Sequence, residues 1–212
     1  MYVPRFNVMG ERPEIEAFVR AHHTGQLITV GPDGVPDASL LPVLWEGERL
    51  VAHLARANPQ WQRIADDSPA LVVVTSPDTY ISPGWYESKR EHGRVVPTWN
   101  YSAVHLTGTV RVIHDPEWLR EAVSTLTERH ESRREEPWQV TDAPAKYVDG
   151  QLRAIVGLEM AVTRVEGKAK LSQNRSDEDR EGAIDGLRAT TDPAAHAVAE
   201  AMAAVLSAER QV

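Results

Sequence analysis

The chain has 212 residues and an ordinary globular composition, with 42% hydrophobic and 25% charged residues. It contains no cysteine, which excludes disulfides, thiolate metal sites and a cysteine nucleophile. Its formal net charge of −8 gives little support to DNA binding through phosphates. No apolar run approaches the ~20 residues of a membrane span, so we expect no membrane insertion. The absence of cysteine fits a cytoplasmic protein.

The first half of the sequence predicts a short helix followed by an antiparallel meander of strands. Apolar side chains at helical spacing place the helix at Pro13–His22. The expected strands are Gln26–Val30, Val35–Trp45, Arg49–Ala55 and Ala70–Ser76. Pro36 and Pro42 indicate that the second strand is an edge strand or carries a bulge.

The second half begins with a segment from Pro77 to Asn100 that lacks regular periodicity. The elements expected after it are a strand at Tyr101–Ile113, a helix from Asp115-Pro116 to about Glu136, a long strand at Ala154–Val165, a helix from the Ser176 cap to Leu187, and a final helix opened by Asp192-Pro193. Strands and helices do not alternate regularly, which argues against a doubly wound parallel sheet. We therefore expect an α+β fold, mainly β with peripheral helices, in which a closed or half-closed antiparallel barrel forms one domain over residues 1–212.

The segment from Leu50 to Trp61 predicts a strand that runs into a helix with an anion site at its first turn. Asn58 suits the N-cap and Pro59 the first helical position, and the helix is expected to continue to about Asp66. Free N–H groups in such a turn attract phosphate, and Arg56 adds a bidentate donor beside them. The alternative interpretation is a capped helix with a solvent-exposed arginine.

His53 lies in the strand before that turn, on the same face as Val51 and Ala55. A single histidine on an apolar face is usually a satisfied core residue. The other interpretations are an axial haem ligand and a hydrogen-bond donor to a cofactor.

Aromatic side chains are concentrated in the irregular segment, which carries Trp85, Tyr86, Trp99 and Tyr101. Aromatic density beside proline and glycine suits a subunit interface or a flat ligand. A loop pinned to the barrel by its own aromatics is the alternative.

A cation-rich stretch, Lys168–Arg175, lies between the last long strand and a capped helix. It combines three cations and three polar side chains in eight positions. This composition suits either the binding of an anion or a solvated turn.

Several blocks of the sequence, in order along nearly the whole chain, are similar to those of one family. They are Met1–Pro4, His53–Trp61, Tyr80–Pro83, Trp85-Tyr86, Val96–Tyr101, Ala103–His105, Gly157 and Lys170–Arg175. The sequence resembles in these blocks the PaiB family, described as FMN-binding negative transcriptional regulators. The resemblance implies an FMN-binding split barrel, related to pyridoxamine phosphate oxidases, that acts as a homodimer with cofactor sites between subunits.

The resemblance also implies roles for individual residues. Arg56 and the helix start at Asn58 would contact the flavin phosphate, with His53 and Trp61 as further cofactor-binding residues of the same block. The residues that would line the dimer-side pocket are Trp99, Asn100, Lys170 and Gln173. The implied function is a negative transcriptional regulator or a flavin-dependent sensor or oxidoreductase, and whether the protein is an enzyme stays open.

A second branch with the same fold uses haem and gives the alternative hypothesis. Piperazate synthases resemble the PaiB family and close a nitrogen–nitrogen bond in N5-hydroxyornithine, and on that template His53 would be the axial haem ligand. Glu91–Pro97 and Asn174-Arg175 instead look like the general PaiB pattern. A third hypothesis is a regulator without a cofactor that acts through protein contacts or DNA, although no helix-turn-helix is evident.

Overall fold

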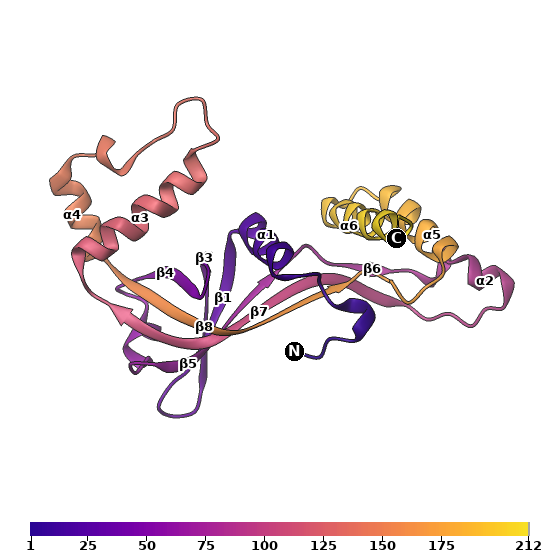
Figure 1. The fold of residues 1–212 in the computed structure, drawn as a ribbon, viewed down its shortest axis with the longest axis horizontal. Helices are drawn as coiled ribbons and strands as arrows, with labels where there is room; N and C mark the ends of the chain where they lie inside the picture. The colour runs from indigo at the N-terminus through magenta and orange to yellow at the C-terminus, as the bar shows by residue number, and fades with distance from the viewer. Residues whose placement is uncertain (212) are drawn as a thin grey trace. The chain divides into compact units, whose positions relative to one another are not determined.

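The structure is a computed structural model that describes residues 1–211. These residues form two compact units, each assembled from separate stretches of the chain. Unit 1 comprises residues 1–15, 75–104 and the chain from Glu166 onward, and unit 2 comprises Glu16–Val74 and His105–Val165. The long strands β7 (Thr98–Ile113) and β8 (Ile155–Lys170) contribute residues to both units (Figure 1). The expected single domain over residues 1–212 stays a prediction.

Unit 2 contains an antiparallel sheet that is rolled up. Besides β7 and β8, the sheet contains β1 (Thr24–Val30), β2 (Pro36–Pro42), β3 (Leu44–Glu46), β4 (Arg49–Ala55) and β5 (Ser68–Thr75). The strand order is β2-β1-β5-β7-β8-β4-β3. Only Val43 separates the first and last strands of this order in the sequence, so the sheet must curl until its two edges lie close together. This arrangement is the antiparallel split β-barrel that the sequence predicted.

The expected second strand, Val35–Trp45, is divided in the structure into β2 and β3. Pro36 and Pro42 are the terminal residues of β2, which is an edge strand paired with β1. Between the two strands, the N–H of Val43 donates to the carbonyl oxygen of His23 at 2.9 Å. The prediction of an edge strand is therefore confirmed, whereas the single strand expected at Val35–Trp45 is interrupted at Val43.

The barrel interior is filled by alternate residues of the paired strands. In the register of β4 with β8, the inward pairs are Leu50 with Met160, Ala52 with Leu158 and Leu54 with Val156. Each of these six side chains is at most 6% exposed. Because side chains alternate along a strand, the intervening residues of β4 lie on the outer face of the barrel.

The helices of unit 2 pack on one another through a small apolar cluster. α3 (Pro116–Glu131) and α4 (Ala145–Arg153) share a core of Leu119, Val148 and Leu152. The carboxylate of Asp115 accepts the N–H groups of Glu117 and Trp118, as the cap-then-proline pattern predicted. The helix ends at Glu131, five residues before the expected end, and α4 was not predicted. α1 (Arg12–His22) matches its prediction.

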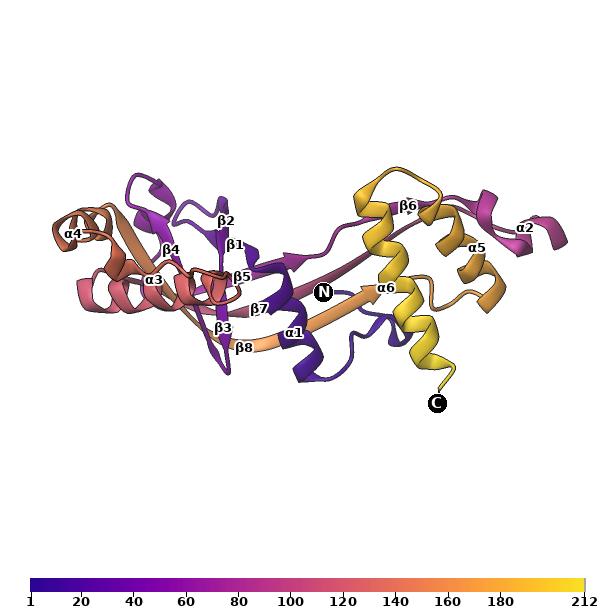
Figure 2. The ribbon, with the colours of Figure 1, turned by 90° about the horizontal axis from the view of Figure 1, so that it is seen from above.

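Unit 1 is organised around two helices, α5 (Asp177–Arg188) and α6 (Pro193–Glu209), which lie side by side (Figures 1 and 2). Ser176 and Asp192 cap them as predicted. The segment expected to be irregular contains β6 (Thr79–Ile81), a 3-10 turn at Pro83–Trp85 and α2 (Glu87–Glu91). These elements are too short to show periodicity, and β6 is fixed by pairing with the start of β7. No helix within residues 1–211 is long and apolar enough to cross a membrane.

Candidate functional site

The junction after β4 contains the predicted cap but a shorter helix than expected. The side-chain oxygen of Asn58 accepts the N–H of Gln60 at 2.9 Å, and Pro59 occupies the first helical position. The helix is a 3-10 helix, η2 (Pro59–Arg63), and does not reach Asp66. A helix of five residues has little macrodipole, so the anion attraction expected from the helix itself is weak here.

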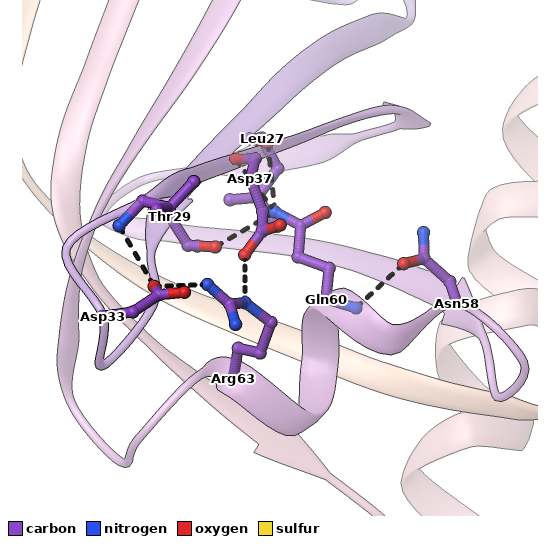
Figure 3. Close-up of polar contacts among 8 residues, drawn as sticks. Leu27, Thr29, Asp33, Asp37, Asn58, Gln60 and Arg63 are labelled. Carbon is purple, nitrogen blue, oxygen red and sulfur yellow. Dashed lines mark hydrogen bonds and ion pairs between the residues drawn. The ribbon is translucent and has the colours of Figure 1, made fainter.

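The polar side chains of η2 hold it to the β1–β2 hairpin (Figure 3). The buried Gln60 amide donates to the hydroxyl of Thr29 at 3.0 Å. Arg63 donates to the carboxylates of Asp37 at 2.7 Å and Asp33 at 2.6 Å. Because these partners bind the helix to a neighbouring hairpin, Gln60 and Arg63 position the junction, and the sequence offered no sign of either role.

Arg56 lies at the end of β4 and is held in place by main-chain acceptors. Its Nε donates to the carbonyl oxygen of Arg153 at 2.8 Å and its Nη2 to that of Ile155 at 3.0 Å. Its guanidinium lies 6.0 Å from the ring centre of Trp61, whose indole N–H donates to the Arg56 carbonyl at 2.9 Å. No carboxylate within residues 1–211 neutralises this exposed cation, so it is oriented and available to an anion.

His53 shares a face of β4 with Val51 and Ala55, as predicted, and the structure shows that this is the outer face of the barrel. It is half-buried and pairs across strands with Gly157. Trp118 packs against Gly157, where an added Cβ would come within 2.2 Å of its ring. Burial lowers the pKa of His53, so the imidazole is neutral at pH 7 and keeps a nitrogen lone pair for a ligand.

The other four predicted site residues belong to unit 1. Asn100 is fully buried and donates to the Ser172 hydroxyl at 2.9 Å. The Lys170 ammonium donates to the Thr98 hydroxyl at 2.5 Å and to the Trp99 carbonyl. Gln173 accepts the N–H of Leu171 at 2.8 Å and donates to the Ala169 carbonyl at 2.6 Å, which shapes the turn after β8.

A groove of about 320 Å³ opens beside these residues, entirely within unit 1. It is lined by Tyr2, Pro4, Phe6, Asn7, Val96, Pro97, Thr98, Asn100, Lys168, Lys170, Ser172, Asn174 and Arg175. Asn100 and Lys170 were predicted as pocket residues, whereas Trp99 and Gln173 are not part of the lining. The structure thus places His53, Arg56, Asn58 and Trp61 in unit 2 and the other four predicted residues in unit 1.

The aromatic residues of the segment before β7 divide between core and surface. Tyr86 is buried in the core of unit 1, and Trp85 packs on α5 against Gly182 and Gly186. Tyr80 and Trp99 are about half exposed and meet edge to face, with ring centres 6.2 Å apart. Part of the segment is therefore pinned by its own aromatics, and another part presents two aromatic rings to solvent.

Sequence comparison assigns the chain to a family. Residues 1–164 match the family described as "Putative FMN-binding domain", and the chain belongs to this family. It is 32% identical over 206 residues to the "Protease synthase and sporulation protein PAI 2" of Bacillus subtilis, an alignment that covers 95% of this chain and 96% of that protein. An uncharacterized protein of Saccharomyces cerevisiae is 41% identical over 111 residues, covering 50% of this chain and 66% of its own.

Solved structures show the same fold at low sequence identity. A conserved hypothetical protein from Mycobacterium tuberculosis superposes with a TM-score of 0.59 at 17% identity, covering 82% of this chain and 92% of that one. A structure described as an FAD- and haem-binding protein from Mycobacterium smegmatis also gives 0.59, at 22% identity, with 80% and 76% covered. These similarities confirm the split-barrel fold.

Proposed function

We propose that this protein binds FMN as its cofactor. The observation that carries the proposal is membership, over residues 1–164, of a family described as an FMN-binding domain. FMN supplies redox chemistry when it is bound, through its isoalloxazine ring. The resemblance to PaiB implied the same cofactor.

The donor set at the end of β4 fits a flavin phosphate. Arg56 is an exposed cation whose direction is set by two carbonyl acceptors, and no carboxylate within residues 1–211 competes for its charge. Asn58 fixes the adjacent turn through Gln60 and donates its amide to the Ser39 hydroxyl at 3.0 Å. Arg56 would therefore hold the phosphate, while Asn58 and Gln60 position the backbone beside it.

The test compares FMN with riboflavin, which lacks the phosphate. The Arg56→Ala variant should lose about ten- to a hundredfold in FMN affinity, because a charge-assisted hydrogen bond contributes about 1.5–3 kcal/mol. Its riboflavin affinity should stay that of the parent. Arg134→Ala removes an exposed arginine that is ion-paired with Glu131 and serves as the control. Titration of flavin fluorescence measures the affinities of the parent and both variants for the two flavins.

Two outcomes would contradict the proposal at different levels. A parent protein that takes up neither FMN nor riboflavin rules out flavin binding. Equal losses for FMN and riboflavin in Arg56→Ala would show that Arg56 only holds β4 to the start of β8. A thermal melt of each variant separates this second outcome from unfolding.

A second candidate cofactor is haem, and one observation favours it. Burial lowers the pKa of His53, and a neutral imidazole is the form that ligates iron. One protein with the same fold is described as binding FAD and haem. Reconstitution with haemin and loss of a Soret band in His53→Ala would support this cofactor, whereas an unchanged Soret band would rule out His53 as the ligand.

For the assembly and the regulatory role, we propose a homodimer that acts through protein contacts. The exposed Tyr80–Trp99 pair supplies the kind of aromatic surface that interfaces use. The net charge of −8 disfavours direct contact with DNA phosphates. Light scattering on the parent and on Trp99→Ser tests the dimer, and retardation of promoter DNA that persists at raised salt would contradict the protein-contact route.

A further inference from the structure

The groove of unit 1 has a strongly one-sided charge. Its lining includes Lys168, Lys170 and Arg175 and no aspartate or glutamate. The whole protein has a formal net charge of −8, so a groove with three cations and no acidic residue differs from its average composition. Their placement in one hollow points to a negatively charged occupant.

The partners of these cations are neutral. Lys168 is only 8% exposed, and its ammonium donates to the Tyr101 hydroxyl at 2.9 Å and lies 5.2 Å from the ring centre of Tyr101. The Arg175 guanidinium lies 4.8 Å from the ring centre of Tyr86. Burying a cation beside neutral groups alone leaves much of its desolvation cost uncompensated. A bound anion would compensate that cost.

The floor of the groove is fixed in an unfavourable backbone conformation. Ser172 has a φ of 67°, in the left-handed region that residues other than glycine rarely adopt. Its hydroxyl and the buried Asn100 amide hold each other, at 2.9 Å in one direction and 3.3 Å in the other. Strained residues of this kind are concentrated at ligand-binding sites.

The rim of the groove is apolar. Tyr2, Phe6 and Val96 are 83%, 51% and 64% exposed. Exposed apolar side chains next to the buried Lys168 and the partly buried Lys170 and Arg175 suit a ligand that combines a charged group with an apolar body. Inorganic ions alone would leave the rim without a partner.

We propose that this groove binds a small molecule that carries a phosphate or carboxylate group on an apolar body. Lys168 and Arg175 contact the oxyanion, and Tyr2, Phe6 and Val96 cover the apolar part. Arg56 belongs to unit 2 and is not among the lining residues, and the proposal does not depend on Arg56 holding a flavin phosphate. The oxyanion belongs either to a flavin or to a different small molecule, and competition distinguishes these two sources.

The experiment titrates the full-length protein calorimetrically with phenyl phosphate. The parent should bind it more tightly than inorganic phosphate, because only phenyl phosphate contacts the apolar rim. Lys168→Met and Arg175→Gln should each lower the affinity about tenfold, the effect of losing roughly one charge-assisted hydrogen bond. Lys146→Met, which removes an exposed lysine in α4, should leave it unchanged.

No binding of phenyl phosphate by the parent, or parental affinity in both Arg175→Gln and a folded Lys168→Met, overturns the proposal. Arg175 is partly exposed, so Arg175→Gln keeps the test valid if Lys168→Met fails to fold. Displacement of phenyl phosphate by FMN but not by riboflavin identifies the flavin phosphate as the occupant. Binding unaffected by saturating FMN identifies a separate ligand.

Discussion

Asn100 and Ser172 hold each other through two side-chain hydrogen bonds, with the amide donating at 2.9 Å and the hydroxyl donating back at 3.3 Å. Both residues are buried, and they join the start of β7 to the turn after β8 within unit 1. The pair keeps Ser172 at its positive φ and so shapes the floor of the cationic groove.

Removing the Asn100 amide should destabilise the protein. We expect Asn100→Ala to lower the free energy of unfolding by about 1–3 kcal/mol, because it leaves the buried Ser172 hydroxyl without its partner. Asn174→Ala changes an exposed amide in the same groove and should stay within about 0.5 kcal/mol of the parent. Urea unfolding measures both, and equal effects would show that the pair does not support the turn.

Two glycines of unit 2 should respond in opposite directions to alanine. At Gly157 an added Cβ would come within 2.2 Å of the Trp118 ring, so Gly157→Ala should cost about 1–3 kcal/mol. At Gly150, inside α4, the nearest atom lies 3.9 Å away, so Gly150→Ala should stabilise by about 1 kcal/mol. Urea unfolding of the two variants compares these changes, and a harmless Gly157→Ala would show that Trp118 is free to move.

The buried Arg180 of α5 gives a third prediction. It is 2% exposed and ion-paired with Glu209 of α6, while its Nε and Nη2 have no hydrogen-bond partner within residues 1–211. Glu209→Gln should destabilise by about 1–3 kcal/mol, because the buried charge loses its nearer carboxylate partner, while Asp177 stays at 4.0 Å. Arg180→Met should cost less, or stabilise, because it removes the desolvated charge as well. Thermal unfolding ranks the two variants, and the reverse order would contradict this reasoning.

The sequence predicted those features that depend on neighbouring residues. The caps at Asp115, Ser176 and Asp192 were placed correctly because a cap side chain binds N–H groups two or three residues away. The length of η2 was not predictable, since the partners of Gln60 and Arg63 lie 23 to 33 residues away. Only folding brings those groups together.

The candidate sites also combine features that neighbouring residues reveal with features that only folding brings together. The cation-rich stretch Lys168–Arg175 was visible in the sequence, and its possible anion was one of two interpretations. The apolar rim contributed by Tyr2, Phe6 and Val96 was not visible, because these residues are distant in the chain. Likewise, the face of His53 was predicted from the alternation along β4, but Trp118 beside that face was not.

The affinity of the proposed anion site should decline as pH rises, and this decline should begin at a lower pH than at a site with an ordinary lysine. Burial and then the charge of Lys168 lower the pKa of Lys170 from its usual value. Lys170 gives up its proton as pH rises through this lowered pKa, and one attractive charge is lost. The other cations of the groove are Lys168 and Arg175. Titrations of phenyl phosphate at increasing pH should show the decline, and Lys170→Met should remove it.

The last prediction concerns acid stability, which His53 and His23 should limit. Burial lowers the pKa of both imidazoles below 6.5, and at His23 the charges of His130 and Arg133 add to the effect. The unfolded chain therefore takes up protons at a higher pH than the folded one. Well above pH 6.5 both histidines are neutral in the folded and in the unfolded protein, and neither lowers the free energy of unfolding. As pH falls below 6.5, the half-buried His53 costs up to about 1.4 kcal/mol per pH unit until its folded pKa is reached. The exposed His23 contributes in the same direction but less, because solvent screens its interactions.

His53→Gln should remove one of these two contributions and flatten the loss of stability between pH 6.5 and acid. His23→Asn is the matched variant, because asparagine tolerates the φ of 60° at that position. The two histidines differ in their neighbours, so the two effects should add in the double variant. Urea unfolding at several pH values measures the slopes. A slope unchanged in His53→Gln would mean that this imidazole protonates freely in the folded protein, and a neutral His53 as iron ligand would then lose its support.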